Sequence, residues 1–337
     1  MDSVANALAP GAKPRVMRAF LRHQIEAIGK EGLHKRFGKE SVPMRMIDYA
    51  AGRRVSANKT IARALQTGSP FCASRLGNDE LSTVIAERRL TLSSNSHRVY
   101  ELLALGDPWF SLFRSRRRIM AAGLRPLNRA TRARFSDLIR ESLRNVDLLG
   151  SWLPGENFLS EELGNSHFAP VLDLEPYRQK DPWSKHLEGK RVLIIHPFAK
   201  TIQRQLSTVR AHLFPEQYFL PSFDFEIMVP PRSHFDEVEN ADHWFQLLDE
   251  MFAKLEGRDF DVAVIGAGAF GLPLASRVKA LGKISLHLGG ATQLLFGIHG
   301  RRWNHDPVVA GLRNDFWTRP AESDTPSVRA RSRSPYW

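Results

Sequence analysis

Three short stretches of the 337-residue chain combine residue types that can bind anions or move protons. The first is Arg75-Leu-Gly-Asn-Asp-Glu80, which places a guanidinium group, a glycine turn and two adjacent carboxylates together. Carboxylate oxygens are ligands that Mg²⁺ and Mn²⁺ prefer, so Asp79 and Glu80 are candidate metal ligands. The stretch also suits a helix start, because Asn78 can cap a helix and acidic side chains are favourable in the first turn. Both interpretations stay open, as does a structural ion pair between Arg75 and Glu80.

The second stretch is a glycine-rich turn, Gly266-Ala-Gly268-Ala-Phe-Gly271. It follows an apolar run and precedes a helical pattern, where free backbone N–H groups and the positive end of a helix favour a phosphate. A dinucleotide site also needs an acidic residue about 20 residues later, and residues 286–290 contain none. We therefore expect a diphosphate at this turn, and neither NAD nor FAD. The alternative is that the glycines only allow a helix to pack closely on a strand.

The third stretch pairs His196-Pro-Phe198 with Gly289-Gly290-Ala-Thr-Gln293. Adjacent glycines allow a ligand to approach the backbone closely. His196 is a candidate acid–base group or phosphate donor, although a single histidine is more often a structural hydrogen-bonding group. For His287 we expect a place in the core. The chain has no Walker A, G-x-S-x-G, H-E-x-x-H or protein-kinase motif.

From residue 190 onward, apolar runs alternate with helical patterns, and these elements must position the three stretches. We expect strands at 71–74, 191–195, 224–229, 261–265 and 283–288. We expect helices at 81–89, 201–212, 241–255 and from the glycine-rich turn to about residue 282. Strands separated by helices predict a parallel sheet with right-handed crossovers, which binds ligands beyond the carboxyl ends of its strands. The expected fold class is α/β, a Rossmann-like parallel sheet flanked by helices, with a basic, mostly helical N-terminal region.

The formal net charge of +12 is concentrated in the first half of the chain. Residues 1–150 hold 27 basic and 13 acidic residues, against 21 and 23 in residues 151–337. The densest run is Arg114-Ser-Arg-Arg-Arg118, followed by Arg125, Arg129, Arg132 and Arg134. Such a field attracts phosphates of nucleic acid, anionic lipid or a nucleotide-linked substrate, and a solvated helix face is the alternative. Nucleic acid is the less favoured partner, because no aromatic interleaving, zinc-finger or basic-zipper spacing accompanies the arginines.

Composition indicates a globular protein of a reducing compartment. Hydrophobic residues make up 42% and charged residues 25% of the chain. The single cysteine excludes an internal disulfide and a thiolate metal cluster. No secretory signal and no membrane-spanning apolar stretch are recognised, so we expect a cytoplasmic protein. We divide it into a helical region at 1–64 with a disordered start, an α/β domain at 65–320 with a basic helical insertion at about 98–150, and a tail at 321–337. Residues 151–190 read as a connecting region.

The stretch from Arg75 to Leu81 resembles the R-F-G-D-G-E-L signature of glycosyltransferases with the GT-D fold. Further segments are similar to those of bacterial GT-D-like proteins, and the resemblance covers roughly residues 65–320. These segments are His196-Pro-Phe198, Gly266-Ala-Gly268, residues 287–297, Gly300-Arg-Arg-Trp303 and Phe316-Trp-Thr-Arg-Pro320.

The resemblance implies transfer of a sugar from a nucleotide diphosphate donor, with a divalent metal held near a D-x-E motif. The family's first acid falls on Asn78, its middle glycine on Asp79 and its last acid on Glu80. An amide oxygen is a neutral and weaker ligand, so this departure bears directly on metal dependence. We expect Glu80 or His196 to act as the catalytic base, and Asp79 and Glu80 to hold any Mn²⁺ or Mg²⁺. The expected donor-binding residues are Arg75, Gly77, Asn78, Asp79, Gly266, Gly268, Gly271, Gly290 and Gln293.

The function expected from these observations is a glycosyltransferase of surface polysaccharide or glycoconjugate synthesis. Its partners would be a nucleotide diphosphate-sugar and a glycan or lipid-linked acceptor. The basic helices could then contact the anionic inner face of the membrane. The alternative is a non-catalytic, Rossmann-like phosphate-binding protein that docks on nucleic acid or anionic membrane through those helices.

Overall fold

The computed structural model describes residues 53–91, 128–153, 156, 159–214, 219–231, 241–324 and 336. The expected N-terminal helical region up to residue 52 lies outside this part of the chain. So do the arginine run at 114–118, Arg125 and most of the tail beyond residue 324.

The described residues form a seven-stranded, entirely parallel sheet with the strand order β3-β2-β1-β7-β6-β4-β5. The strands are β1 (Phe71–Ser74), β2 (Leu148–Ser151), β3 (His167–Pro170), β4 (Arg191–Ile195), β5 (Asp224–Met228), β6 (Val262–Ile265) and β7 (Ile284–His287). The five expected strands are confirmed to within one residue at each end. The expected helical end of the insertion at 148–150 is wrong, because β2 lies there, and the presumed connecting region contains β3.

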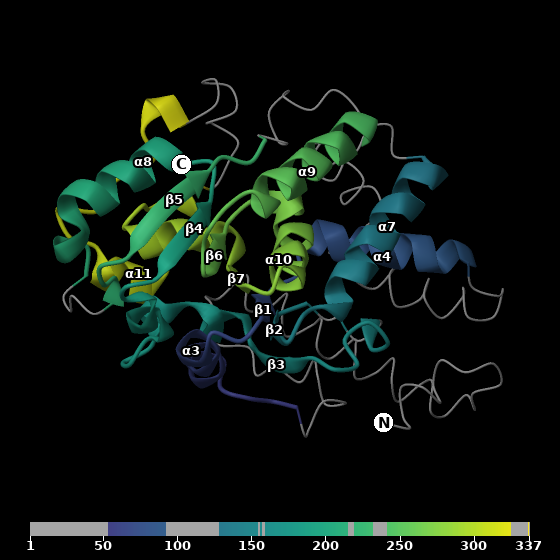
Figure 1. The fold of residues 1–337 in the computed structure, drawn as a ribbon, viewed down its shortest axis with the longest axis horizontal. Coiled ribbons are helices and arrows are strands. Elements are labelled where there is room, and N and C mark those ends of the chain that lie inside the picture. The colour runs from purple at the N-terminus through teal and green to yellow at the C-terminus, as the bar shows by residue number, and fades with distance from the viewer. Residues whose placement is uncertain are drawn as a thin grey trace.

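Helices cover both faces of this sheet, as Figure 1 shows. The α-helices are α3 (Ala57–Thr67), α4 (Asn78–Thr91), α7 (Arg129–Arg144), α8 (Ala199–Arg204), α9 (Ala241–Glu256), α10 (Gly271–Ala280) and α11 (Pro307–Leu312). Helix α8 continues as a π-helical turn, Gln205–Val209. The 3₁₀ turns are Val171–Leu174, Pro176–Arg178, Trp183–Leu187, Arg210–His212, Gly268–Phe270, Gly289–Phe296, Arg301–Trp303 and Glu322–Asp324.

The central strands β1, β7, β6 and β4 are almost wholly buried because each face of the sheet packs against its own core. In β4, Leu193 and Ile195 face a core shared with α4, α7, α9 and α10. Val192 and Ile194 face the opposite core, which α3, α8 and the 3₁₀ turn Gly289–Phe296 complete. The structure is thus a three-layer α/β/α arrangement, and the expected fold class is confirmed.

The segments that follow the neighbouring strands β1, β7, β6 and β4 pack alternately on one face of the sheet and on the other. The helices that follow β1 and β6, α4 and α10, pack in one core. The segments that follow β7 and β4, Gly289–Phe296 and α8, pack in the other. Because β1, β7, β6 and β4 are adjacent in that order, each junction between them is a switch point of the topology. In open parallel sheets, ligands bind beyond the carboxyl ends of strands at such points.

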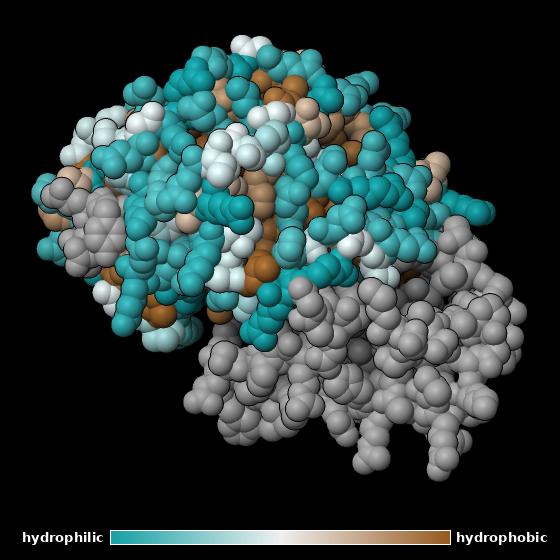
Figure 2. Space-filling model, turned by 60° about the horizontal axis from the view of Figure 1, so that its bottom comes forward, coloured by the Kyte–Doolittle hydropathy of each residue, from teal (hydrophilic) through white to brown (hydrophobic). Residues whose placement is uncertain are grey.

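The described surface is mainly hydrophilic on the face drawn in Figure 2, with hydrophobic residues in narrow patches. None of the described helices combines the length and the apolar character that crossing a lipid bilayer requires.

Candidate functional site

Arg75 follows the last residue of β1 and lies between two other strand ends. Its side chain passes over Gly289, after β7, where a Cβ atom would lie 3.1 Å from the Arg75 Cδ. Gly289 also has a φ of +62°, which favours glycine. The guanidinium carbon lies 4.7 Å from the ring centroid of Trp152, which follows β2. Trp152 is fixed in turn, because its Nε1 donates to the Leu76 carbonyl at 2.8 Å. Three strands therefore position one cation.

The guanidinium group of Arg75 makes no hydrogen bond and no ion pair within the described part of the chain. Burial lowers the pKa of Arg75, and the positive charge of Arg302 lowers it further, while Tyr336 and the carboxylates of Glu175 and Glu80 act in the opposite direction. The group carries several N–H donors in a planar fork that matches phosphate or carboxylate oxygens. A stacked, partly buried arginine with unused donors at the strand ends is an arrangement suited to binding an anion.

Glu80 is the third residue of α4, and its side chain folds back over Gly77, the glycine before the helix. A Cβ atom on Gly77 would meet the Glu80 carboxylate, so a larger residue at position 77 would displace the Glu80 side chain. Burial raises the pKa of Glu80 to about 7, and the charge of Asp79 adds to the increase. A carboxyl group with this pKa can exchange a proton near neutral pH, which is what a general base needs.

Asn78 is the first residue of α4. Its Oδ1 is buried and has no hydrogen-bond partner among the described residues. The capping interpretation of Asn78 is therefore wrong, since a cap would direct this oxygen to a backbone N–H. The acidic residues Asp79 and Glu80 do lie in the first turn, as expected.

A divalent cation would find few protein ligands at this helix start. The described residues contain no group of three histidine, cysteine, aspartate or glutamate side chains able to hold a metal. Asp79 and Glu80 supply carboxylates, and Asn78 supplies an unused amide oxygen. These ligands suit an ion whose remaining coordination positions are filled by oxygens from outside the protein. Mg²⁺ is commonly held in this way, by one or two carboxylates together with substrate phosphates and water.

Two glycines of the glycine-rich turn are required for packing inside the protein. A Cβ atom on Gly266 would lie 2.6 Å from the His196 ring and 2.9 Å from the Gly289 carbonyl oxygen. A Cβ atom on Gly271 would collide with the ring of His287. Only Gly268 is exposed, with a φ of +55°. For Gly266 and Gly271 the geometry therefore favours the packing alternative over direct contact with a donor.

The two histidines near these glycines are buried and neutral at physiological pH. Burial lowers the pKa of His196 to about 3, and its Nδ1 accepts a hydrogen bond from the Phe198 N–H at 3.1 Å. Burial, reinforced by the charge of Arg75, also lowers the pKa of His287 to about 3. His287 Nδ1 lies 3.0 Å from the Ser74 hydroxyl, which agrees with its expected place in the core. Between the two expected bases, this geometry favours Glu80 over His196.

The remaining expected donor contacts, Gly290 and Gln293, lie against Tyr336. The Tyr336 ring covers Gly290. The Gln293 side-chain amide donates to the Ile298 carbonyl at 3.1 Å and to the Tyr336 carbonyl at 3.3 Å. Gln293 therefore supports the backbone around Tyr336.

Sequence reasoning missed four residues around Arg75: Trp152, Glu156, Glu175 and Arg302. Glu156 is fully buried and its carboxylate bonds the Ser151 hydroxyl at the end of β2. Burial raises the pKa of Glu156 to about 7. For Trp152 and Glu156 the sequence carried little signal, because the strand that precedes them is only four residues long and contains a glycine.

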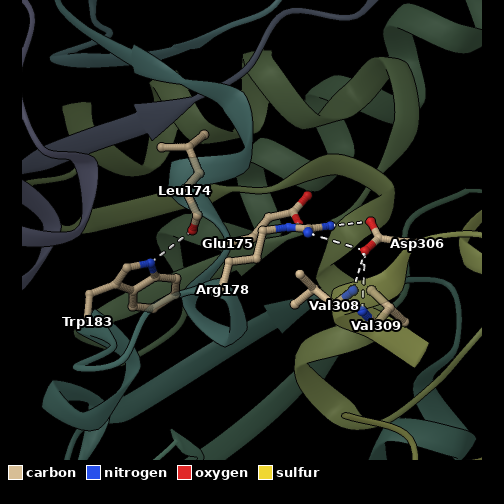
Figure 3. A network of polar contacts seen from close by, with 7 residues as sticks. All are labelled: Leu174, Glu175, Arg178, Trp183, Asp306, Val308 and Val309. Carbon is tan, nitrogen blue, oxygen red and sulfur yellow. Dashed lines mark hydrogen bonds and ion pairs between the residues drawn. The ribbon is translucent and has the colours of Figure 1, made fainter. Parts of the chain in front are cut away.

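An ion-pair network joins the 3₁₀ turn Pro176–Arg178, after β3, to Asp306 at the start of α11, as Figure 3 shows. Arg178 Nε lies 2.5 Å from Glu175 Oε2, and the two terminal nitrogens of Arg178 donate to the Asp306 carboxylate. Asp306 also caps α11 by accepting from the N–H groups of Val308 at 3.1 Å and Val309 at 3.3 Å. The Asp306 N–H donates to the Trp303 carbonyl at 3.1 Å, so the network is also connected to the turn Arg301–Trp303.

The described part of the basic stretch is largely engaged within the protein. Arg132 Nε lies 2.8 Å from the Glu87 carboxylate. The Arg134 guanidinium carbon lies 3.7 Å above the Phe245 ring, and a terminal nitrogen lies 3.6 Å from Asp242. The contacts of Arg132 and Arg134, with Arg129 and Arg134 exposed on α7, favour the solvated helix face for this part of the stretch.

Comparison with protein-family models, with curated proteins and with solved structures gives no match for this chain. The candidate site combines Arg75, whose guanidinium group has no partner among the described residues, with Glu80, whose pKa burial raises, at the carboxyl ends of a parallel sheet.

Proposed function

We propose that this protein is a glycosyltransferase that uses a nucleotide diphosphate-sugar donor. The observation that carries the proposal is the guanidinium group of Arg75, which is held by Trp152 and Gly289 and has no partner within the described chain. A second cation, Arg302, is close enough to lower the pKa of Arg75. Two adjacent cations with unused donors suit a ligand with more than one negative charge, such as a diphosphate.

In the proposed reaction, the oxygen of an acceptor hydroxyl forms a bond to the anomeric carbon while the bond from that carbon to the diphosphate breaks. Negative charge grows on the leaving diphosphate, and donors fixed in advance lower the energy of that transition state. Arg75 and Arg302 would supply these donors. Glu80, as the carboxylate, would accept the proton that the acceptor hydroxyl loses, since its pKa of about 7 allows exchange near neutral pH.

A divalent cation, Mn²⁺ or Mg²⁺, would be held by Asp79 with the amide oxygen of Asn78 and phosphate oxygens of the donor, which leaves Glu80 to act as the base. It would add positive charge at the leaving group. Because the protein ligands are few and Arg75 already provides a cation, we expect Mn²⁺ to strengthen donor binding and its chelation to weaken that binding without abolishing it. The acceptor we propose is a glycan or lipid-linked glycan at the cytoplasmic face of the membrane.

Thermal unfolding with a panel of nucleotide diphosphate-sugars, with and without Mn²⁺, tests the proposal. A ligand at about 100 times its dissociation constant stabilises the folded state by about 2.7 kcal/mol, so a true donor is readily detected. The variant Arg75→Met retains an apolar contact with Trp152 but loses the charge, and we expect it to lose the donor-induced increase in Tm.

The matched control is Arg191→Met, which removes an exposed arginine paired with Asp259 and Asp261 at the opposite ends of the strands. It should keep the response to the donor. An unchanged response in Arg75→Met would contradict the site. No response to any donor in the wild-type protein would contradict the function and favour the non-catalytic alternative.

A further inference from the structure

Tyr336 is held against the candidate site by contacts on three sides. Its ring lies on the backbone of Gly290 and 6.0 Å from the Trp303 ring. Its hydroxyl accepts a hydrogen bond from Arg302 Nη1 at 3.0 Å. Its carbonyl oxygen accepts from Gln293 Nε2 at 3.3 Å. We refer to the surface formed by Gly290, Gly300, Arg302 and Trp303 as the ring site.

At both glycines of the ring site, contact with Tyr336 leaves no room for a side chain, and the backbone conformation is one that any residue adopts. Gly290 is not among the glycines with positive φ, and Gly300 has a φ of −136°, which any residue adopts. A Cβ atom on Gly290 would collide with the Tyr336 ring, and one on Gly300 with the Tyr336 main chain. The bare backbone of Gly290 therefore provides a flat surface for a planar ring.

The ring site adjoins the anion site at Arg75. Arg302 and Tyr336 are both near enough to shift the pKa of Arg75, in opposite directions. The Tyr336 hydroxyl oxygen thus lies among cations at the place where an oxygen atom of a ligand would be favoured. A planar ring with an acceptor oxygen on its edge, placed next to a diphosphate, has the composition of a nucleoside diphosphate.

We propose that the ring site binds the nucleobase of the donor and that Tyr336 occupies it in the free protein. The inference rests on the function proposed above and deepens it. Arg302 donates to an oxygen acceptor, so the site selects a base with a carbonyl oxygen on its edge, such as uracil, and disfavours adenine, which has none. Binding of such a donor displaces the Tyr336 ring, while inorganic diphosphate binds at Arg75 without displacing it.

Isothermal titration of the full chain with UDP, ADP and inorganic diphosphate tests this. If Tyr336 occupies the ring site about nine-tenths of the time, Tyr336→Ala raises the affinity for UDP about tenfold. The affinity for inorganic diphosphate stays within about twofold, because that ligand does not compete with the ring. Tyr336→Phe, which removes only the hydrogen bond to Arg302, gives a smaller increase in the same direction.

A double variant tests the site without relying on Tyr336. In the Tyr336→Ala background, Gly290→Val fills the space of the ring and returns the affinity for UDP to the wild-type value or below, with no effect on inorganic diphosphate. Phe316→Ala, which removes an exposed aromatic ring stacked on His212, is the control and leaves all three affinities unchanged.

Two results would overturn the inference while leaving the proposed function in place. One is a fall or no change in UDP affinity in Tyr336→Ala. A fall would mean that Tyr336 is a fixed part of the binding site, and no change would mean that it has no role in binding. The other is an equal increase for ADP and UDP, which would remove the selective role of Arg302. If neither UDP nor inorganic diphosphate binds to any variant, the proposed function fails, and the inference fails with it.

Discussion

Replacing Glu156 by glutamine is expected to stabilise the protein, in a manner that depends on pH. The Glu156 side chain is fully buried, and its carboxyl group bonds the Ser151 hydroxyl and faces the Trp152 N–H at 3.5 Å. Burial raises the pKa of Glu156 from 4.5 to about 7, because the charged form is poorly solvated there. Glutamine has the same shape, stays neutral and can keep one donor and one acceptor in place.

Proton linkage gives the sign and the size of the change in the free energy of unfolding. Between pH 4.5 and 7 the folded protein holds a proton on Glu156 that the unfolded chain has lost, so the free energy of unfolding falls as the pH rises. No penalty exists below pH 4.5, and the full penalty is present above pH 7. A shift of 2.5 pKa units at 1.36 kcal/mol each gives a penalty of about 3 kcal/mol. Glu156→Gln removes it.

Urea unfolding of both proteins between pH 5 and pH 8 measures this effect. The difference between the two free energies of unfolding should be below about 1 kcal/mol at pH 5 and rise to about 3 kcal/mol in favour of the variant at pH 8. Glu162→Gln is a useful control, because Glu162 is also buried but lies 2.6 Å from Arg140. That variant should lose about 1–3 kcal/mol at pH 8. Parallel curves for the wild type and Glu156→Gln would refute the reasoning.

Two further changes test the packing that supports the site. Arg178→Met leaves the carboxylates of the buried Glu175 and the half-buried Asp306 without their shared cation. It should lower the free energy of unfolding by about 2–4 kcal/mol; a loss below about 0.5 kcal/mol in urea would contradict the network. Gly271→Ala should cost about 1–3 kcal/mol because its Cβ collides with the His287 ring, whereas Gly257→Ala, with open space around the new Cβ, should change stability by less than about 0.5 kcal/mol; equal effects of the two changes would contradict the packing role of Gly271.

The sequence predicted the strands whose residues are apolar on both faces and missed those whose pattern is interrupted. Residues 192–195 and 262–265 are continuous apolar runs, and both lie in strands. Leu148–Ser151 contains a glycine and His167–Pro170 ends in a proline, so neither shows a run or an alternation. Each is only four residues long, and pairing with its neighbours stabilises it. Because β2 and β3 were not predicted, the positions of Trp152, Glu156 and Glu175 near the strand ends could not be predicted either.

The roles of the glycines could not be predicted from their spacing, because a glycine is needed for three different reasons: backbone conformation, close packing, or room for a ligand. Gly289 has a positive φ and lies under Arg75. Gly266 and Gly271 are needed because neighbouring histidine rings fill the space of a side chain. Gly290 has an ordinary φ and faces the Tyr336 ring. Only the tertiary contacts separate backbone conformation, packing and room for a ligand.

Strand order is the information that connects Arg75 to its surroundings. In the sequence, its neighbours are Asn78, Asp79 and Glu80, and from these alone a metal or an ion pair was the natural expectation. In the sheet, β1 pairs with β2 at Ser74 and Leu149 and with β7 at Ala73 and Leu286. Because parallel strands end on the same side, this pairing brings Trp152 and Gly289 to the two sides of Arg75. The strand order and the motif Arg75-Leu-Gly-Asn-Asp-Glu80 therefore both favour an anion site, and Arg75 is the residue that both place in it.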